Sequence, residues 1–404
     1  MKNEIIPRTE TVKFSRRRYS PDERRRMSIR PRCHGEFFMD SKKNILIHNL
    51  MRDAIRLAGD GLQRVSPNPR TGAIILRGDK VIGRGRHACC GGLHAEVEAI
   101  RDAGGDVRGC EMIVTLEPCC HTGRTAPCTD LIIRHGISKV YIGMEDPNPL
   151  VAGKGIKQLR QVGIEVVTDI LRDECAELNQ PFIKMMTLGF PYMIAKTAIT
   201  LDGYIADINK RSKWISSAES RREAHRMRAQ YDAVMVGMGT VIADDPQLNV
   251  RDVPGDDPVR VVFDPAGSLP EQSKLVKSAG TTPLYVITGE KISAKWKKAL
   301  EANDVQMICE KGDPETVLVR GLRRLGREGI QSVLIEGGGK LQSMLAAGDN
   351  IDRVELFIAP KLLGDGIPMM KIPFRFMPDP AEFVSHAWIP HGPDMRFTGI
   401  IKKY

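Results

Sequence analysis

The sequence of 404 residues lacks the segments that would place a protein in a membrane or send it to one. No apolar run reaches the roughly 18 residues that a transmembrane helix needs. The N-terminal segment is rich in arginine and has no apolar stretch typical of a secretory signal peptide. We therefore expect a cytoplasmic protein with no membrane partner.

The chain also lacks an internal repeat, and its two halves do not resemble each other. Its length is too great for one ordinary hydrophobic core, so two or more different domains are expected. Hydrophobic residues make up 42% and charged residues 27%, which is typical of globular proteins.

The net charge of +10 is concentrated at one end of the chain. Residues 1–38 hold eleven Lys or Arg and five Asp or Glu, a net +6, so the other 366 residues carry only +4. This segment has no apolar periodicity, which predicts a disordered basic extension over residues 1–40. It could serve nucleic-acid binding or organelle targeting, but we favour translation starting at Met39 and expect no nucleic-acid partner.

Alternating helical and strand patterns predict an α/β domain over residues 44–188. We expect helices at 44–58, 94–103, 128–135 and 156–162, a hairpin over 72–83, and strands at 112–116 and 140–144. A second α/β domain is expected over 190–404, with a mainly parallel sheet. Its predicted strands are 193–198, 233–237, 260–263, 284–288, 332–336 and 353–359, and its main helices are 217–230 and 315–326.

Cysteines cluster in the first domain. Nine cysteines in a cytoplasmic protein argue against a disulfide framework. Six of them lie within forty residues and alternate with histidines, which indicates a metal site. These six are Cys89, Cys90, Cys110, Cys119, Cys120 and Cys128.

The clearest chemical pattern places His94 two residues before Glu96 and follows it with Cys119 and Cys128. One imidazole and two thiolates balance the charge of zinc and leave its fourth position open, which is the catalytic arrangement. Pro118 suits the first turn of a helix, so we expect Cys119 near a helix N-terminus, where a thiolate is favoured. Glu96 is spaced to move protons at the metal.

Two other interpretations of these residues are open. The zinc could be purely structural, or the thiols could be buried without metal, and Cys120 is close enough to Cys119 to compete as a ligand. An acid two residues beyond the His has no structural purpose, however, so we favour a catalytic site. Cys89, Cys90 and Cys110 are then bystanders.

Zinc nucleobase deaminases combine H-x-E with P-C-x-x-C. Here eight residues separate the two cysteines, which excludes a simple match to the cytidine or tRNA-adenosine type. The segment Thr115–Cys128 closely resembles the deaminase motif of the bifunctional deaminase–reductase family of riboflavin biosynthesis. This resemblance implies a cytidine-deaminase-like α/β/α layer domain with one zinc per chain on His94, Cys119 and Cys128. It also implies that the substrate is held by Asn68, His87, His121 and Arg124.

A glycine-rich segment in the first domain is a false lead. Residues 83–88 fit the loose dinucleotide-binding pattern G-x-G-x-x-A. They leave a predicted hairpin and run into Cys89 and Cys90, not into a helix, so the required context is missing.

The second domain has no proper Rossmann fingerprint either. Its motifs are 196–203, 212–215, 227–230, 239–246 and 336–339, the last of which runs from a strand through glycines into a helical pattern. Backbone N–H groups in such a turn hold phosphates, although tight packing explains a glycine turn equally well.

In this order, the motifs resemble the reductase domain of the same family, which is similar in fold to dihydrofolate reductase. The resemblance covers residues 45–404. It implies that NADPH contacts Ala198, Trp214, Thr240, Asp244, Gly338 and Gly339, with core packing as the alternative for Trp214. It implies that the substrate is bound by Ser212, Arg228, Leu248, Arg251 and Glu336. Lys196 and Glu336 would be catalytic and face the reacting sugar carbon.

The sequence therefore predicts a bifunctional zinc deaminase and NADPH reductase of riboflavin synthesis, acting on a phosphoribosyl pyrimidine, and we expect a homo-oligomer. The family pattern is broken at Gly92-Leu93, Cys120, Ala126, Tyr204, Lys210-Arg211 and Pro265. The last four positions motivate one alternative, a deaminase with an inactive reductase-like domain. A second alternative is a zinc-bearing nucleic-acid-binding protein that uses its basic extension.

Overall fold

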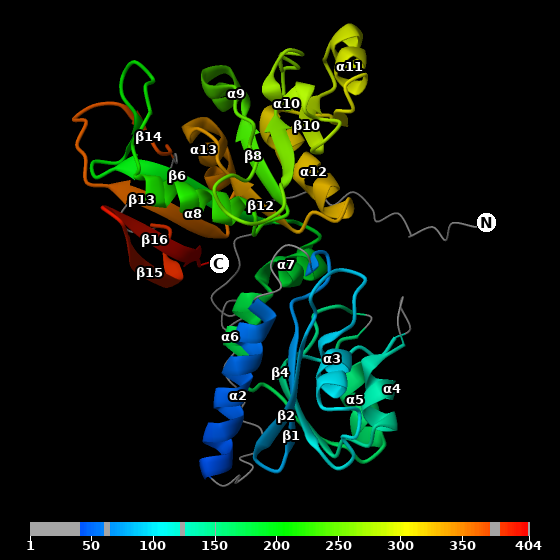
Figure 1. Cartoon of the computed structure of the whole chain (residues 1–404). Helices are drawn as coiled ribbons and strands as arrows, with labels where there is room; N and C mark the ends of the chain where they lie inside the picture. The colour runs from blue at the N-terminus through cyan, green and yellow to red at the C-terminus, as the bar shows by residue number, and fades with distance from the viewer. Residues whose placement is uncertain (1–40, 60–64, 122–125, 150, 372–379, 403–404) are drawn as a thin grey trace, which may run out of the picture. The chain divides into compact units, whose positions relative to one another are not determined.

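The computed structural model describes residues 41–59, 65–121, 126–149, 151–371 and 380–402. The predicted disordered extension 1–40 and the predicted ligand Arg124 lie outside these residues. Within them the chain forms one five-stranded, one nine-stranded and one two-stranded sheet (Figure 1). None of the described helices combines the length and apolar character that a transmembrane segment needs.

The five-stranded sheet has the strand order β2-β1-β3-β4-β5. β1 pairs antiparallel with β2 and β3, whereas β3, β4 and β5 are parallel. The elements of this part are α2 (Ser41–Gly59), β1 (Gly72–Arg77), β2 (Lys80–Arg86), α3 (Ala95–Asp102), β3 (Glu111–Leu116), α4 (Cys128–Arg134), β4 (Lys139–Met144), α5 (Lys154–Gln161), β5 (Glu165–Val167), α6 (Arg172–Leu178) and α7 (Gln180–Leu188).

Helices cover both faces of this sheet, with α2 on one face and α3, α4 and α5 on the other (Figure 1). The helix α3 lies unusually close to β2, because a Cβ atom on Gly85 would lie 2.1 Å from the carbonyl oxygen of Ala95. Gly83 makes a similar approach to Ala99. The glycines that mimic a dinucleotide motif therefore fix α3, and with it the His94–Glu96 motif, against the sheet.

The nine-stranded sheet has the order β11-β10-β9-β8-β12-β6-β13-β16-β15. All neighbouring strands from β11 to β13 are parallel. At the other edge, β16 pairs antiparallel with both β13 and β15. Its strands are β6 (Tyr192–Thr200), β8 (Ala233–Gly237), β9 (Val259–Phe263), β10 (Leu284–Gly289), β11 (Gln306–Glu310), β12 (Ser332–Ile335), β13 (Arg353–Ala359), β15 (Phe383–His391) and β16 (Asp394–Ile401). A small sheet pairs β7 (Tyr204–Ala206) with β14 (Ile367–Pro368).

Helices cover both faces of the large sheet as well. They are α8 (Ala218–Arg228), α9 (Met238–Asp244), α10 (Lys274–Lys277), α11 (Ala294–Glu301), α12 (Pro314–Arg327) and α13 (Gly339–Ala347). In β8, Ala233 and Met235 pack in the cluster with α12 and α13, whereas Val234 and Val236 pack in the cluster with α10 and α11. A central parallel strand buried on both faces is continuously apolar, which is why its sequence does not alternate.

The carboxyl ends of β8 and β12 form a topological switch point. These strands are neighbours, but the chain continues from β8 through α9 to β9 on one side and from β12 through α13 to β13 on the other. In open α/β sheets, ligands bind in the crevice that such diverging connections leave. The predicted residues Thr240, Glu336 and Gly338 all follow these two strand ends.

Candidate functional site

The three predicted zinc ligands converge in the first domain. His94 is the N-cap of α3, Cys128 is the first residue of α4, and Cys119 lies in the loop after β3. The His94 Nδ1 atom lies 3.2 Å from the Cys128 sulfur and 3.6 Å from the Cys119 sulfur. One ligand atom from each residue lies within 4.8 Å of the others. One nitrogen and two sulfurs at this spacing fit a tetrahedral zinc with one open position.

The environment of Cys119 favours a thiolate, but not through the helix that Pro118 predicted. Pro118 does not open a helix, because residues 117–120 form none, but Cys119 does lie at a helix N-terminus, that of α4, which begins at Cys128. The backbone N–H at the start of α4 donates to the Cys119 sulfur over 3.4 Å. A hydrogen bond from the Cys128 thiol, joined by His94, lowers the pKa of Cys119 well below the ordinary value of a thiol.

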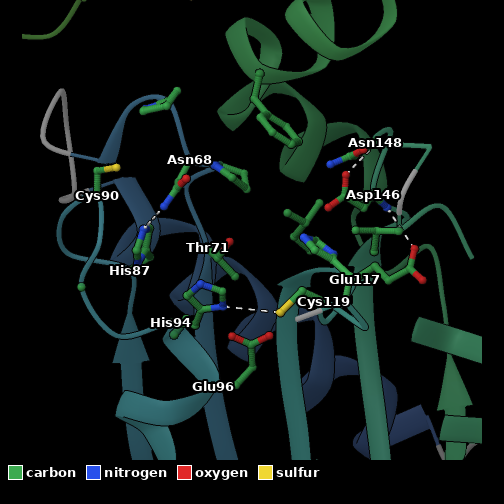
Figure 2. Close-up of a pocket in the computed structure, with 18 of the residues that line it drawn as sticks. Asn68, Thr71, His87, Cys90, His94, Glu96, Glu117, Cys119, Asp146 and Asn148 are labelled. Atoms are coloured by element: carbon green, nitrogen blue, oxygen red, sulfur yellow. Dashed lines mark hydrogen bonds between the residues drawn. The ribbon is translucent and has the colours of Figure 1, made fainter. Parts of the chain in front are cut away.

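Glu96 lies in the first turn of α3 and is almost completely buried. Its carboxylate points toward His94 and Cys119 (Figure 2). Burial, joined by the charge of Cys119, raises the pKa of Glu96 to about 7. A carboxyl group therefore lies beside the nitrogen and sulfur atoms that would bind zinc.

A cavity of about 510 Å³ opens above these residues (Figure 2). The predicted site residues that line it are Asn68, His87, His94, Glu96, Cys119 and His121. His87 Nδ1 lies 2.9 Å from the Leu93 carbonyl oxygen, so Nδ1 carries the proton and Nε2 accepts from the Asn68 amide at 2.9 Å. Burial lowers the pKa of His87, which keeps its ring neutral in this arrangement.

Sequence reasoning missed the part that Glu117 plays. Its buried carboxylate accepts backbone N–H groups from Asp146 at 3.2 Å, Gly153 at 2.9 Å and Ile156 at 3.1 Å. It thereby ties the end of β3 to the segment 146–156, which supplies Asp146 and Asn148 to the cavity wall. The position of Glu117 beside Pro118 and Cys119 could have marked it as a site residue. Its hydrogen-bond partners could not be read from the sequence, because they lie 29 to 39 residues away.

A second cavity, of about 670 Å³, lies in the reductase-like domain. Eight predicted residues from five segments of the chain line it. They are Lys196, Ala198, Ser212, Trp214, Arg228, Asp244, Leu248 and Arg251. Trp214 is 63% exposed, with the Arg221 guanidinium 4.5 Å from its ring, so core packing does not explain it.

Glu336 is the centre of a buried ionic network behind this cavity. The Arg228 guanidinium donates to both of its carboxylate oxygens, at 2.7 and 2.8 Å, and Lys196 Nζ lies 3.9 Å away. Although burial raises the pKa of Glu336, the two cations outweigh it and hold the pKa at about 2. Burial lowers the pKa of Lys196, and Glu336 opposes that shift.

The remaining cofactor residues lie at the strand ends, not among those that line the cavity. Gly338 is the N-cap of α13, and its N–H donates to the Thr240 hydroxyl at 3.2 Å. A Cβ on Gly338 would meet nothing closer than 3.9 Å, whereas one on Gly339 would lie 3.0 Å from two backbone oxygens of the segment 368–369. The open backbone at Gly338 and the N-terminus of α13 fit a phosphate group, as a nucleotide cofactor requires.

Three positions that depart from the family pattern, Tyr204, Lys210 and Arg211, are not among the residues that line this cavity. The Tyr204 N–H donates to the Thr200 hydroxyl at 3.0 Å at the start of β7. Lys210 adopts a left-handed backbone conformation in the turn that follows, and Arg211 pairs with Asp207 at 2.7 Å.

Two family models match this chain. Residues 46–144 match the cytidine and deoxycytidylate deaminase zinc-binding region, and residues 191–374 match the RibD C-terminal domain. The riboflavin biosynthesis protein RibD of Actinobacillus pleuropneumoniae is 40% identical over 325 residues, which are 80% of this chain and 86% of that protein. The chain belongs to the RibD family of riboflavin biosynthesis proteins.

Further RibD relatives agree over most of the chain. The Aquifex aeolicus protein is 40% identical over 81% of this chain and 90% of its own length. A solved structure from Thermotoga maritima is 36% identical, has a TM-score of 0.78, and matches 89% of this chain and all of its own. It is named a diaminohydroxyphosphoribosylaminopyrimidine deaminase/5-amino-6-(5-phosphoribosylamino)uracil reductase.

Membership of the RibD family confirms the resemblance and the two-domain α/β fold that the motifs predicted. The chain carries a deaminase domain of the zinc-binding type and a RibD reductase domain, and is a bifunctional enzyme of riboflavin biosynthesis. The roles of the individual site residues and the domain limits at 44–188 and 190–404 stay predictions.

Proposed function

We propose that the first domain hydrolyses the 2-amino group of 2,5-diamino-6-(5-phosphoribosylamino)pyrimidin-4-one and releases ammonia. The convergence of His94, Cys119 and Cys128 beside buried Glu96 carries this proposal. The Thermotoga maritima relative, whose name states a deaminase of this substrate class, supports it.

In this domain each residue has a distinct task. Zinc on His94, Cys119 and Cys128 would supply a Lewis acid that makes a water nucleophilic near neutral pH. Glu96 takes a proton from the attacking water and returns it to the leaving amine, so that water and substrate yield ammonia and the pyrimidinone. Asn68 and His87 orient the pyrimidine ring, while His121 and Arg124 hold the phosphoribosyl end.

We propose that the second domain reduces the ribosyl group of 5-amino-6-(5-phosphoribosylamino)uracil to ribityl. NADPH would supply the hydride for C1′, and the reaction also consumes one proton. Lys196 faces the reacting carbon and donates that proton, while Glu336 holds the ammonium group in place. The cofactor is bound by Ala198, Trp214, Thr240, Asp244 and the turn at Gly338. The substrate enters the cavity that Ser212 and Arg251 line.

One experiment tests both halves. The purified protein is incubated with the diaminopyrimidine substrate, with and without NADPH. We expect ammonia release in both reactions and loss of NADPH absorbance only after deamination. Ammonia release without any NADPH oxidation would show instead that the reductase-like domain is inactive.

A further inference from the structure

The loop that presents Arg251 to the reductase cavity has a strained backbone. We call residues 248–252 the phosphate loop, because the proposed function assigns Leu248 and Arg251 in it to the phosphoribosyl substrate. Leu248 and Asp252 have φ angles of 57° and 62°, in the left-handed region that side chains disfavour. Such conformations persist only where neighbouring groups hold them.

Two side chains of α8 hold this loop by its peptide groups. The Arg228 guanidinium donates to the carbonyl oxygen of Asn249 at 2.8 Å. One turn earlier on the helix, the Nδ1 atom of His225 accepts the backbone N–H of Arg251 at 3.1 Å. The helix α8 therefore forms hydrogen bonds with the loop backbone on both sides of Val250.

A third contact comes from the chain that follows the loop. The Asp257 carboxylate accepts the backbone N–H of Val250 at 2.7 Å. Three successive residues of the phosphate loop are thus fixed through their backbones. Of these three residues, Arg251 lines the cavity and is exposed.

His225 accepts this bond only while its ring is neutral, because an imidazolium has two donors and no acceptor. The ring is buried, and burial lowers its pKa. The charges that act on it are Arg228 on its own helix, Arg251 on the loop, and Glu336 after β12. The two cations lower the pKa of His225 further, and Glu336 and a hydrogen bond with the Asn249 backbone oppose them.

Three of the five N–H donors of Arg228 are used within the protein. Its Nε and one Nη2 donor go to Glu336, and one Nη1 donor goes to Asn249. Arg251 is exposed, and its side chain donates to the Asn249 side chain at 3.1 Å. Arg251 is therefore the more accessible of the two arginines for a phosphate.

We propose that α8 is a two-point clamp for the reductase substrate. His225 is a positioning residue that acts through the backbone of Arg251, and Arg228 positions both Asn249 and Glu336. The phosphate of the substrate meets a preformed loop, so binding does not have to order it. This inference rests on the proposed reductase function and adds His225, which the sequence did not single out.

The test compares two substrates and two replacements of His225. Reductase kinetics are measured with 5-amino-6-(5-phosphoribosylamino)uracil and with its dephosphorylated ribosylamino form. His225→Leu should raise KM for the phosphorylated substrate by about 3- to 10-fold, the loss typical of one hydrogen bond. Its kcat, and its KM for the dephosphorylated form, should stay within about twofold of wild type.

His225→Asn should restore most of the affinity, because its amide oxygen offers an acceptor near the position of Nδ1. The matched control is Arg226→Leu, since Arg226 is the next residue on α8 and only pairs with Glu223. This control should change neither KM. An unchanged kcat with the dephosphorylated substrate in every variant shows that the reductase domain is folded.

A pH series separates positioning from simple packing. As the pH falls, the wild-type KM should rise more steeply than that of His225→Asn, because only histidine loses its acceptor when it takes up a proton. The substrate phosphate also takes up a proton at low pH, but equally for both proteins. The difference between the two profiles therefore reports on His225.

A double-mutant cycle decides whether His225 acts through Arg251. His225→Leu combined with Arg251→Ala should bind the phosphorylated substrate no worse than Arg251→Ala alone. Additive effects, or equal losses with both substrates, would overturn the clamp. If wild-type protein never oxidises NADPH with either substrate, it is the proposed reductase function that fails.

Discussion

The two cavities of this protein are built in different ways. The predicted metal ligands of the first site all lie within residues 94–128, at two helix starts and in one loop. The reductase cavity is lined by residues between Lys196 and Lys274, from β6, α8 and several loops, and its lining residue Lys196 lies beside Glu336 from a further segment. The first site is a local motif and can be recognised from spacing, whereas the second exists only once the sheet has formed.

The buried carboxylates of the two sites also differ. At Glu96, burial and the charge of Cys119 outweigh the opposing charge of His94 and raise the pKa to about 7. Glu336 is slightly more exposed, and although burial acts on it too, Arg228 and Lys196 hold its pKa at about 2. A glutamate side chain can therefore transfer a proton in the first site and keep a permanent negative charge in the second, because its neighbours set its pKa.

The largest expected effect separates the two sites completely. Cys119→Ser should lose zinc and all measurable ammonia release, because the thiolate ligand is gone, while reduction of pre-deaminated substrate should be unchanged. Metal content, which we expect to be one zinc per chain, and both activities are measured together. Cys120→Ser is the control and should lose neither; full zinc occupancy in the Cys119 variant would refute the ligand assignment.

A second substitution tests chemistry without removing the metal ligands. Glu96→Gln should keep its zinc but lose deamination by about 10²–10⁴-fold, the usual contribution of a general acid–base group. NADPH oxidation with pre-deaminated substrate should match wild type. A variant that still releases ammonia at the wild-type rate would remove Glu96 from the mechanism.

The third prediction concerns the ionic network. Glu336→Gln should stop NADPH oxidation and leave ammonia release intact. It should also cost about 3–5 kcal/mol of unfolding free energy, because Arg228 and Lys196 remain as buried cations without their partner. Denaturant titration measures this loss, and Glu290→Gln, which breaks an exposed pair with Lys311, is the control.

The same network predicts how stability depends on pH. The folded pKa of Glu336 is held below its ordinary value of 4.5, so its stabilising contribution is present above pH 4.5 and is lost as the pH falls toward 2. The Glu336→Gln protein should show a smaller loss of stability over this range than wild type. Equal slopes for the two proteins would show that folding does not lower the pKa of Glu336.

The smallest expected effect lies at Glu117. Glu117→Gln should cost about 1–3 kcal/mol, because an amide nitrogen cannot accept the backbone N–H groups that the carboxylate holds. Zinc should stay bound, and the deaminase KM should rise a few-fold as segment 146–156 loosens. Glu98→Gln, which affects only an exposed pair with Arg101, should change stability by less than about 0.5 kcal/mol.

Much of the fold followed from local patterns. The 72–83 hairpin, the helix after His94, and the six predicted strands of the second domain all appear in the structure. The hairpin β15–β16 was not predicted, because β15 is exposed along most of its length and its sequence has no regular apolar alternation. The helix expected at Pro118 was wrong, because the chain forms a loop there and begins α4 only after Pro127.

The sequence by itself predicted the metal site, because residue type and spacing singled out His94, Cys119 and Cys128, which converge in the structure. It also determined the family, through motifs spread over both domains. Only the tertiary structure decided what holds those residues in place. The three backbone donors of Glu117, the switch point between β8 and β12, and the grip of His225 on the phosphate loop join segments far apart in the chain. Such contacts depend on strand order and packing, which no local pattern encodes.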